Sequence, residues 1–263
     1  MKSFSIGKCF GVLSFWLLLN HPIAAQTTSV AVAANMKDAF TAINSAFIAS
    51  GKPELRIVYG SSGNFASQIM NGAPFNLLIS ADENYPLELF KNGKTVDAGK
   101  VYAVGRLAML TKNSSGIKFN PDAKQDKAEL ARVISKANKI AIAKPELAPY
   151  GRAAVEHLKA IGLWELAKDK LVYADNVGMA TMFVSTGAAD LGFTSLSLAK
   201  SPELVKDTSY LELEETWYTP IKQRMVLIKG ALPEASDLYQ FMQSTKARQI
   251  LIQYGYSLPG NQP

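Results

Sequence analysis

Residues 55–82, LRIVYGSSGNFASQIMNGAPFNLLISAD, hold the pattern that decides the fold. The apolar run Leu55–Tyr59 ends at a Gly-Ser-Ser-Gly turn, after which apolar residues recur at helical spacing. A second apolar run, Leu77–Ser80, follows a Gly-Ala-Pro break. This order predicts strand, helix and parallel strand, the unit of an α/β protein. The helix begins at the turn, so its free N–H groups and the hydroxyls of Ser61 and Ser62 suit an anion.

The first 25 residues indicate the cellular compartment in which the protein acts. Two lysines precede an apolar run, Phe10–Leu19, which is too short to span a bilayer, and small residues then lead to Ala25. This order is typical of a secretory signal peptide, so we predict cleavage near Ala25 and export to the periplasm. An uncleaved anchor is the alternative. Cys9, the single cysteine, would leave with the signal peptide, which suits an oxidising compartment.

The composition allows two cores and gives little support to nucleic-acid binding. Of 263 residues, 48% are hydrophobic, and no stretch after the first 25 is apolar enough to cross a membrane. The formal net charge is +6, but the basic residues are mixed with acidic ones and form no basic run. We therefore expect no nucleic-acid partner.

Two long apolar stretches predict how the chain divides. Val101–Thr111 and Pro220–Lys229 have the character of long strands. If both cross between lobes, residues 26–106 and 219–263 form the first lobe and residues 107–218 the second. Two strands that cross side by side would make a hinge, with the ligand in the cleft. The alternative is a single sheet with both strands at its centre.

Strand-to-helix turns mark the place where a ligand is expected. Four such turns recur, after Ala34, Tyr59, Ala143 and Ala174. Open parallel sheets bind ligands at the carboxyl ends of their strands, so these turns are the first candidates for a site.

The usual catalytic constellations are absent from the sequence. The turn Gly60–Asn64 departs from a nucleophile elbow, because the second glycine of that motif would fall at Asn64. His157, the one histidine after the predicted signal peptide, lies mid-helix, where we expect it to be solvated or partly packed. Triads and common zinc sites are thus almost excluded. Asp82 and Asp175 keep a carboxylate mechanism open, although helix capping accounts better for Asp82.

Binding of an anion fits the turns better than catalysis. A fully ionised tetrahedral oxyanion offers only acceptors, so neutral N–H and O–H donors suit it. Asn35, Ser61, Ser62 and Tyr150 supply such donors beside the helix N-termini. Phosphate keeps a proton at neutral pH and needs an acceptor, for which Asp175 is available. Each residue also has a plainer reading: the serines as caps, Asn35 as the end of a strand, and Tyr150 as a packed aromatic ring.

The order of motifs resembles the periplasmic molybdate-binding proteins of ABC importers, which have the type II periplasmic binding fold. The segments that carry the resemblance are VAVAANMKDAF, YGSSGNFASQIMNGAPFNLLISAD, KPELAPYG, DNVGMATMFVSTGAADLGFTS and QYGY. It implies two lobes, each a mixed, mostly parallel sheet flanked by helices, joined by a two-strand hinge. It also implies a receptor without enzymatic activity or cofactor that binds molybdate, and tungstate, and delivers it to a membrane permease. A monomer suits that role.

The resemblance also implies a set of ligand positions. They are Asn35, Ser62, the N–H and hydroxyl of Tyr150, and the N–H of Val177. Molybdenum would be present only as the oxyanion, without direct protein ligands to the metal. One position departs from the family pattern, because a late strand that often carries a tyrosine leads here to Ser195. Tyr150 can substitute for that tyrosine from the opposite side, and replacement by Ser195 is left open.

Two alternatives remain at the level of the sequence. One is a receptor for another oxyanion, sulfate or phosphate, on the same fold. The other is a secreted hydrolase that uses Ser62 or the carboxylates. Turnover of an ester or phosphoester would separate the second alternative from a receptor.

Overall fold

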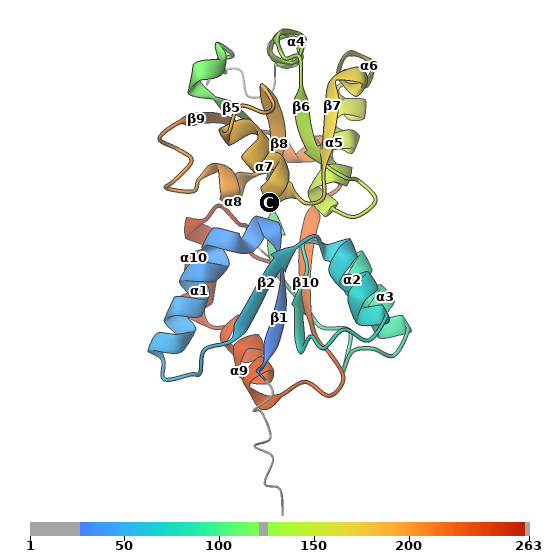
Figure 1. Ribbon diagram of the computed structural model, residues 1–263, viewed down its shortest axis with the longest axis vertical. Coiled ribbons are helices and arrows are strands. Elements are labelled where there is room, and N and C mark those ends of the chain that lie inside the picture. The colour runs from blue at the N-terminus through green and yellow to red at the C-terminus, as the bar shows by residue number, and fades with distance from the viewer. Residues whose placement is uncertain (1–26, 121–125, 261–263) are drawn as a thin grey trace, which may run out of the picture.

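The computed structural model describes residues 27–120 and 126–260, which form two lobes, one above the other in Figure 1. Each lobe contains a five-stranded sheet with helices packed against it. The predicted two-lobed α/β fold is thus confirmed, and the single-sheet alternative is wrong. The predicted signal peptide, residues 1–25, with its cleavage near Ala25, lies outside the described residues.

The first lobe, the lower one in Figure 1, has the strand order β2-β1-β3-β10-β4. β1 is parallel to β2 and β3, whereas β10 is antiparallel to β3 and β4. The strands are β1 (Ser29–Ala33), β2 (Arg56–Gly60), β3 (Leu77–Ile79), β4 (Lys100–Gly105) and β10 (Ile221–Leu227). The helices are η1 (Ala34–Met36), α1 (Lys37–Ala49), α2 (Ser62–Met70), α3 (Asn84–Lys91), α9 (Pro233–Phe241) and α10 (Thr245–Gln253).

The second lobe repeats this plan with the order β7-β6-β8-β5-β9. β6 is parallel to β7 and β8, and β5 is antiparallel to β8 and β9, so parallel pairs make up half of each sheet rather than most of it. The strands are β5 (Leu107–Lys112), β6 (Ile140–Ala143), β7 (Leu171–Ala174), β8 (Leu191–Ser195) and β9 (Thr208–Glu212). The helices are η2 (Asn113–Ser115), α4 (Lys127–Lys136), α5 (Pro149–Ala160), α6 (Trp164–Ala167), η3 (Lys168–Lys170), α7 (Val177–Ser185) and α8 (Leu196–Ala199).

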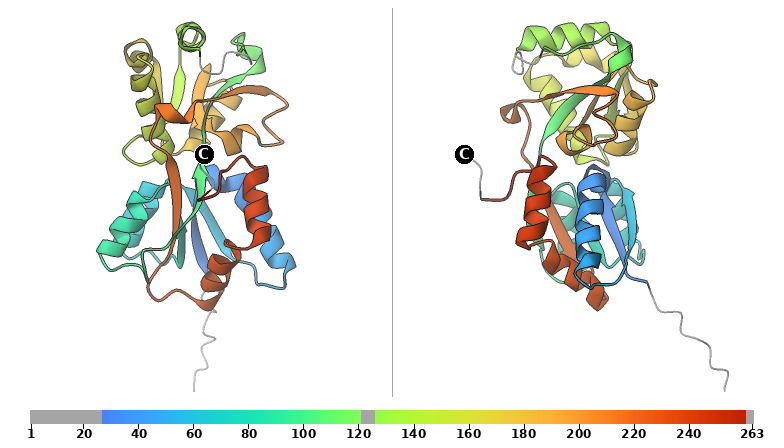
Figure 2. Two further views of the ribbon diagram at one scale, coloured as in Figure 1. Left: turned by 180° about the vertical axis from the view of Figure 1, so that it is seen from behind. Right: turned by 90° about the vertical axis from the view of Figure 1, so that its left-hand side faces the viewer.

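The first crossing between the lobes lies inside the predicted strand Val101–Thr111. That stretch forms two strands, because β4 ends at Gly105 and β5 begins at Leu107. β4 belongs to the first sheet and β5 to the second, so the chain changes sheets at Arg106. Figure 2 shows this connection, in green, passing from one lobe to the other.

The second crossing differs from the prediction. The predicted strand Pro220–Lys229 corresponds to β10, which pairs only with β3 and β4 and therefore stays in the first lobe. The chain returns through residues 213–220, which include the short helix η4 (Glu215–Trp217). The two-strand hinge thus consists of one strand-to-strand step and one irregular segment. A strand could not begin earlier with full pairing, because Pro220 has no N–H to give to a sheet.

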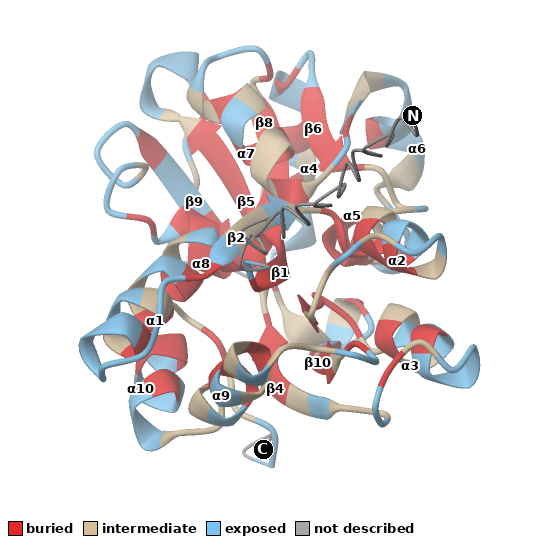
Figure 3. Cartoon of the chain, turned by 60° about the horizontal axis from the view of Figure 1, so that its bottom comes forward, coloured by how far each residue is buried: buried red, intermediate tan, exposed pale blue. Residues whose placement is uncertain are grey.

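Helix faces with apolar spacing bury each sheet on both sides. In α1 the buried side chains are Ala39, Phe40, Ile43 and Phe47, at steps of one, three and four residues. This face packs with α9 and α10 on one side of the first sheet, while α2 and α3 cover the other side. The central strands β1, β3, β6 and β8 are accordingly buried along their whole length, whereas the edge strands β2, β7 and β9 are partly exposed (Figure 3). Burying each large apolar side chain stabilises the fold by about 1.5–3 kcal/mol.

His157 belongs to the core of the second lobe and not to a surface. It is 0% exposed, and its ring lies 5.4 Å from the ring of Trp217 and 6.0 Å from that of Phe193. The expectation of a solvated or partly packed histidine is therefore wrong. Burial lowers the pKa of His157 to about 4, so the imidazole is neutral at pH 7.

Candidate functional site

The strand-to-helix turns of both lobes meet around one small cavity. Its volume is about 10 Å³, little more than the space for one water-sized sphere. The structure brings all four predicted ligand residues to its wall: Asn35 and Ser62 from the first lobe, and Tyr150 and Val177 from the second. The other lining residues are Ala33, Ala34, Gly60, Ser61, Ala81, Ala148, Pro149 and Asn176.

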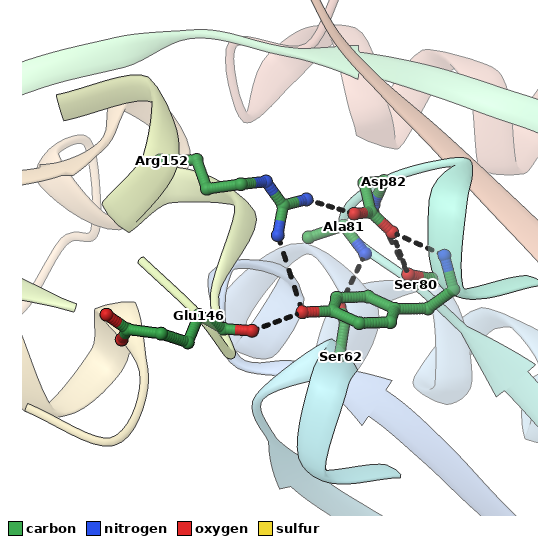
Figure 4. A network of polar contacts seen from close by, with 7 residues as sticks. Ser62, Ser80, Ala81, Asp82, Glu146 and Arg152 are labelled. Atoms are coloured by element: carbon green, nitrogen blue, oxygen red, sulfur yellow. Dashed lines mark hydrogen bonds and ion pairs between the residues drawn. The ribbon is translucent and has the colours of Figure 1, made fainter. Parts of the chain in front are cut away.

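The N-terminus of α2 supplies the two serines. Ser61 is its N-cap, because the Ser61 Oγ accepts a hydrogen bond from the N–H of Asn64 at 3.2 Å. Ser62 is 1% exposed, and its Oγ accepts a bond from the N–H of Ala81 at 2.9 Å (Figure 4). The acceptor side of the Ser62 hydroxyl is thus used, and its proton is left for a ligand.

Two helices of the second lobe begin at the same cavity. Asn176 caps α7 through a bond from the N–H of Met179 to its Oδ1 at 3.0 Å, which leaves Val177 as the first helical residue. α5 begins at Pro149, and Tyr150 follows in its first turn. First-turn N–H groups have no partner within a helix and carry its positive dipole end. The N–H groups of Val177 and Tyr150 are therefore donors for an anion.

A glycine lets the two lobes meet closely beside the cavity. The Gly63 N–H, in α2, donates to the carbonyl of Leu147 in the other lobe at 3.0 Å. A Cβ on Gly63 would lie 2.8 Å from that carbonyl oxygen, closer than real Cβ contacts allow. Any other residue would push the lobes apart, so Gly63 is needed for this contact.

Asn35 is held by a buried polar network that the sequence did not predict. Its Nδ2 donates to the Oε1 of Gln223 at 3.1 Å and to the hydroxyl of Tyr256 at 2.8 Å. Gln223 in turn donates from Nε2 to the hydroxyl of Tyr150 at 3.1 Å and accepts from that of Tyr102 at 2.8 Å. Burial raises the pKa of all three phenols well above their usual range, so they stay protonated. The signal in the sequence is the alternation of β10, which places the polar Gln223 on the same buried face as the apolar Ile221 and Met225.

The cavity is neutral. None of its lining residues carries a charge, so N–H and O–H dipoles would stabilise a bound anion. Asp175, predicted as an acceptor for a protonated anion, does not line the cavity: its exposed carboxylate pairs with Lys144 at 2.7 Å. Ser195 does not line it either, because its Oγ accepts from the N–H of Leu198 and caps α8.

A polar cluster joins the lobes beyond the cavity wall (Figure 4). The guanidinium of Arg152, on α5, forms an ion pair with Asp82 of the first lobe. The hydroxyl of Tyr85 donates to the carbonyl of Glu146 at 2.7 Å, and the ring of Tyr85 lies 5.5 Å from the Arg152 guanidinium.

Asp82 combines this ion pair with part of the predicted capping role. Glu83 occupies the N-cap position of α3 without a side-chain capping bond, whereas the Oδ1 of Asp82 accepts from the N–H of Tyr85 at 3.4 Å and from the hydroxyl of Ser80 at 3.2 Å. Burial raises the pKa of Asp82, although the nearby Arg152 acts in the opposite direction.

An open groove of about 370 Å³ lies between the lobes beside the cavity. It is lined by η1, β2 and α1 residues of the first lobe and by α7 and α8 residues of the second. Tyr59 and Met182, one from each lobe, are 36% and 49% exposed in this groove.

The described residues offer no familiar catalytic or metal site. Within residues 27–120 and 126–260 there is no group of three or more His, Cys, Asp or Glu side chains that could hold a metal ion. In the same part of the chain, no helix is long and apolar enough to cross a membrane. The Ser62 hydroxyl contacts a backbone N–H rather than a base, and His157 is packed among aromatic rings.

Two lobes that enclose a small neutral cavity are typical of one class of protein, the two-lobed solute-binding proteins. Residues 28–257 match the bacterial extracellular solute-binding proteins, and the chain belongs to this family. The family acts outside the cytoplasm and consists of binding proteins rather than enzymes.

Particular relatives narrow the comparison. The chain is 35% identical to the molybdate-binding protein ModA of Azotobacter vinelandii over 262 residues, which cover 97% of this chain and 99% of that protein. It is 33% identical to ModA of Rhodobacter capsulatus over 238 residues, 89% of this chain and 90% of that one. The solved structure of the Azotobacter vinelandii periplasmic molybdate-binding protein superposes with a TM-score of 0.78, at 30% identity, over 88% of this chain and 99% of that one. These likenesses confirm the family resemblance seen in the sequence.

Proposed function

We propose that this protein is a periplasmic receptor that binds molybdate between its lobes and delivers it to the permease of an ABC importer. The observation that carries the proposal is the uncharged cavity at the N-termini of α2, α5 and α7. Its donors are the hydroxyl of Ser62 and the N–H groups of Tyr150 and Val177. The printed names of the relatives support the same ligand.

The size and charge of the cavity restrict the ligand. The closed cavity of about 10 Å³ holds little more than one water molecule, so any ligand requires the lobes to part. A small ion requires the least opening, which favours it over a sugar or an amino acid. Tungstate has the same charge and shape as molybdate, and we expect it to bind as well. We expect the site to need no cofactor. We also propose that the protein acts as a monomer after its signal peptide has been cleaved.

One observation favours a second candidate, a receptor for hydrogen phosphate. The Oδ1 of Asn35 is buried and has no hydrogen-bond partner among the described residues. It is an acceptor in the cavity wall, and hydrogen phosphate carries a proton to give to it. Molybdate carries none at neutral pH.

Calorimetric titration of residues 26–263 with molybdate, tungstate, sulfate and phosphate tests the proposal. We expect one-to-one binding of molybdate and tungstate and no heat from the other two ions. Binding of phosphate alone would establish the second candidate. Binding of sulfate would show a receptor for another oxyanion, and silence from all four would contradict an oxyanion receptor.

A further inference from the structure

The network around Asn35 leaves some donors and acceptors unmatched. The single proton of the Tyr102 hydroxyl faces two acceptors, the carbonyl of Ser80 at 2.9 Å and the Oε1 of Gln223 at 2.8 Å. The Tyr150 hydroxyl accepts from Gln223, and within the described residues its own proton has no acceptor. The Oδ1 of Asn35 has no partner either. With the Gln223 and Asn35 amides in these orientations, one acceptor at Tyr102, the proton of Tyr150 and the Oδ1 of Asn35 are thus left without a partner.

Reversal of two amides, together with a turn of the Tyr256 hydroxyl, gives these three groups their partners without moving the backbone. If the Gln223 amide turns by half a rotation, its Oε1 accepts the proton of Tyr150, and its Nε2 donates to Tyr102 and to Asn35. Tyr102 then keeps its proton for Ser80. If Asn35 turns as well, its NH₂ group faces the cavity and its Oδ1 accepts from Gln223. The Tyr256 hydroxyl, which accepts from Asn35 Nδ2 before the reversal, must then turn its proton to this Oδ1, and the Asn35 carbonyl keeps the Ser197 hydroxyl as its donor. An amide is nearly symmetric in shape, so this exchange needs no extra space.

We propose that Gln223 is a positioning residue for the ligand: in the anion-bound protein it holds Asn35 with its NH₂ group toward the anion. The inference rests on the proposed function and adds how that site rejects protonated anions. With both amides reversed, the wall offers donors only, which suits a fully ionised oxyanion and leaves a protonated one without an acceptor. Gln223 is 0% exposed and does not itself line the cavity, so it acts through Asn35.

The surroundings of Gln223 fix its place while leaving its amide free to turn. A Cβ on Gly105, at the end of β4, would collide with both the Tyr150 hydroxyl and the Nε2 of Gln223. The missing side chain at Gly105 therefore lets Gln223 and Tyr150 approach the crossing strand. The positioning group sits where the first lobe passes into the second, and it contacts residues of both.

Two substitutions of Gln223 separate positioning from packing. Gln223→Met keeps the length but removes both polar atoms, so Asn35 loses its anchor and molybdate affinity should fall about 10-fold. Gln223→Glu, measured at about pH 8.5 so that the carboxyl is ionised, offers acceptors only. It would draw the NH₂ of Asn35 away from the anion, and the loss should reach about 100-fold. Gln253→Met makes the same substitution at an exposed glutamine of α10, away from the cavity, and is the control, which should change affinity by less than about 3-fold.

Nuclear magnetic resonance reads the amide orientation directly in the unchanged protein. With molybdate bound, we expect nuclear Overhauser contacts from the Gln223 side-chain NH₂ protons to the ring of Tyr102 and none to the ring of Tyr150. Contacts to Tyr150 alone would overturn the inference, and so would wild-type affinity in Gln223→Met. If the wild-type protein binds no molybdate, the proposed function fails first, and the two failures are therefore distinguishable.

Discussion

Ser62 combines two hydrogen-bonding roles in one hydroxyl. Its oxygen accepts the N–H of Ala81, and its proton is left for an anion. We predict that Ser62→Ala weakens molybdate binding by roughly 1.5–3 kcal/mol, the usual contribution of a donor to a charged acceptor. Calorimetric titration measures the loss. Ser67→Ala changes an exposed serine on the same helix and should leave affinity unchanged, whereas wild-type affinity in Ser62→Ala would remove Ser62 from the site.

His157 makes the stability of the fold depend on pH. Its pKa is lowered from 6.5 to about 4 in the folded protein, so the unfolded chain binds a proton that the folded chain does not. Stability is complete above about pH 6.5 and falls by roughly 3 kcal/mol as the pH drops toward 4. Urea unfolding of the wild type and of His157→Met at several pH values measures this. Equal pH dependence in the two proteins would contradict the prediction.

The sequence predicted the residues that line the cavity better than the residues that hold them in place. Asn35, Ser62, Tyr150 and Val177 each follow a strand, a local pattern that a reader of the sequence can see. The partner of Asn35 is Gln223, 188 positions away, and no local pattern links the two. The same applies to Arg152 and Asp82, which are 70 positions apart.

At the scale of one element, the N-terminus of α7 both starts the helix and lines the cavity. The Asn176 side chain caps α7 and lines the cavity, so two substitutions separate the roles. Asn176→Asp keeps a capping oxygen but places a negative charge beside the anion. Asn176→Ala removes the cap and adds no charge.

We therefore predict opposite rankings for these two variants. Asn176→Ala should lower stability by about 1 kcal/mol, and Asn176→Asp should lower it less. Molybdate affinity should fall further in Asn176→Asp, because the carboxylate repels an anion. Thermal unfolding and titration of both proteins measure the two effects. The same order in both measurements would show that Asn176 acts only as a cap.

Helices and strands could be predicted where apolar residues repeat over several turns. They were harder to predict where contacts between distant segments set the limits of the element. The buried residues of α1 and α10 recur at steps of three and four, a period that can be detected in the sequence. The strand Val101–Thr111 reads as continuous because both halves are apolar, yet each half pairs in a different sheet. The short helices α6 and α8, of four residues each, give no period to detect.

For the whole molecule, the ion pair of Arg152 with Asp82 holds the lobes together outside the ligand cavity. The Arg152 and Asp82 side chains are 31% and 10% exposed, so solvent screens the pair only in part. This contact acts whether or not an anion is present, and it favours the closed arrangement.

We predict that Arg152→Met speeds the release of molybdate by about 10-fold, corresponding to the loss of one charged hydrogen bond. Small-angle scattering of the ligand-free variant should give a larger radius of gyration than the wild type, because the lobes part more often. Stopped-flow displacement by tungstate measures the release. Lys144→Met removes an exposed ion pair within one lobe and serves as the control. Equal release rates in all three proteins would contradict the prediction.

The groove that carries Tyr59 and Met182 has a practical consequence. These exposed side chains stand on opposite lobes, and the only cysteine of the chain, Cys9, lies in the predicted signal peptide. A thiol introduced at either position would be the sole site for an environment-sensitive dye in the exported protein. Movement of the lobes would then change the fluorescence of the dye. The labelled protein would serve as a fluorescent sensor for a trace nutrient in growth media.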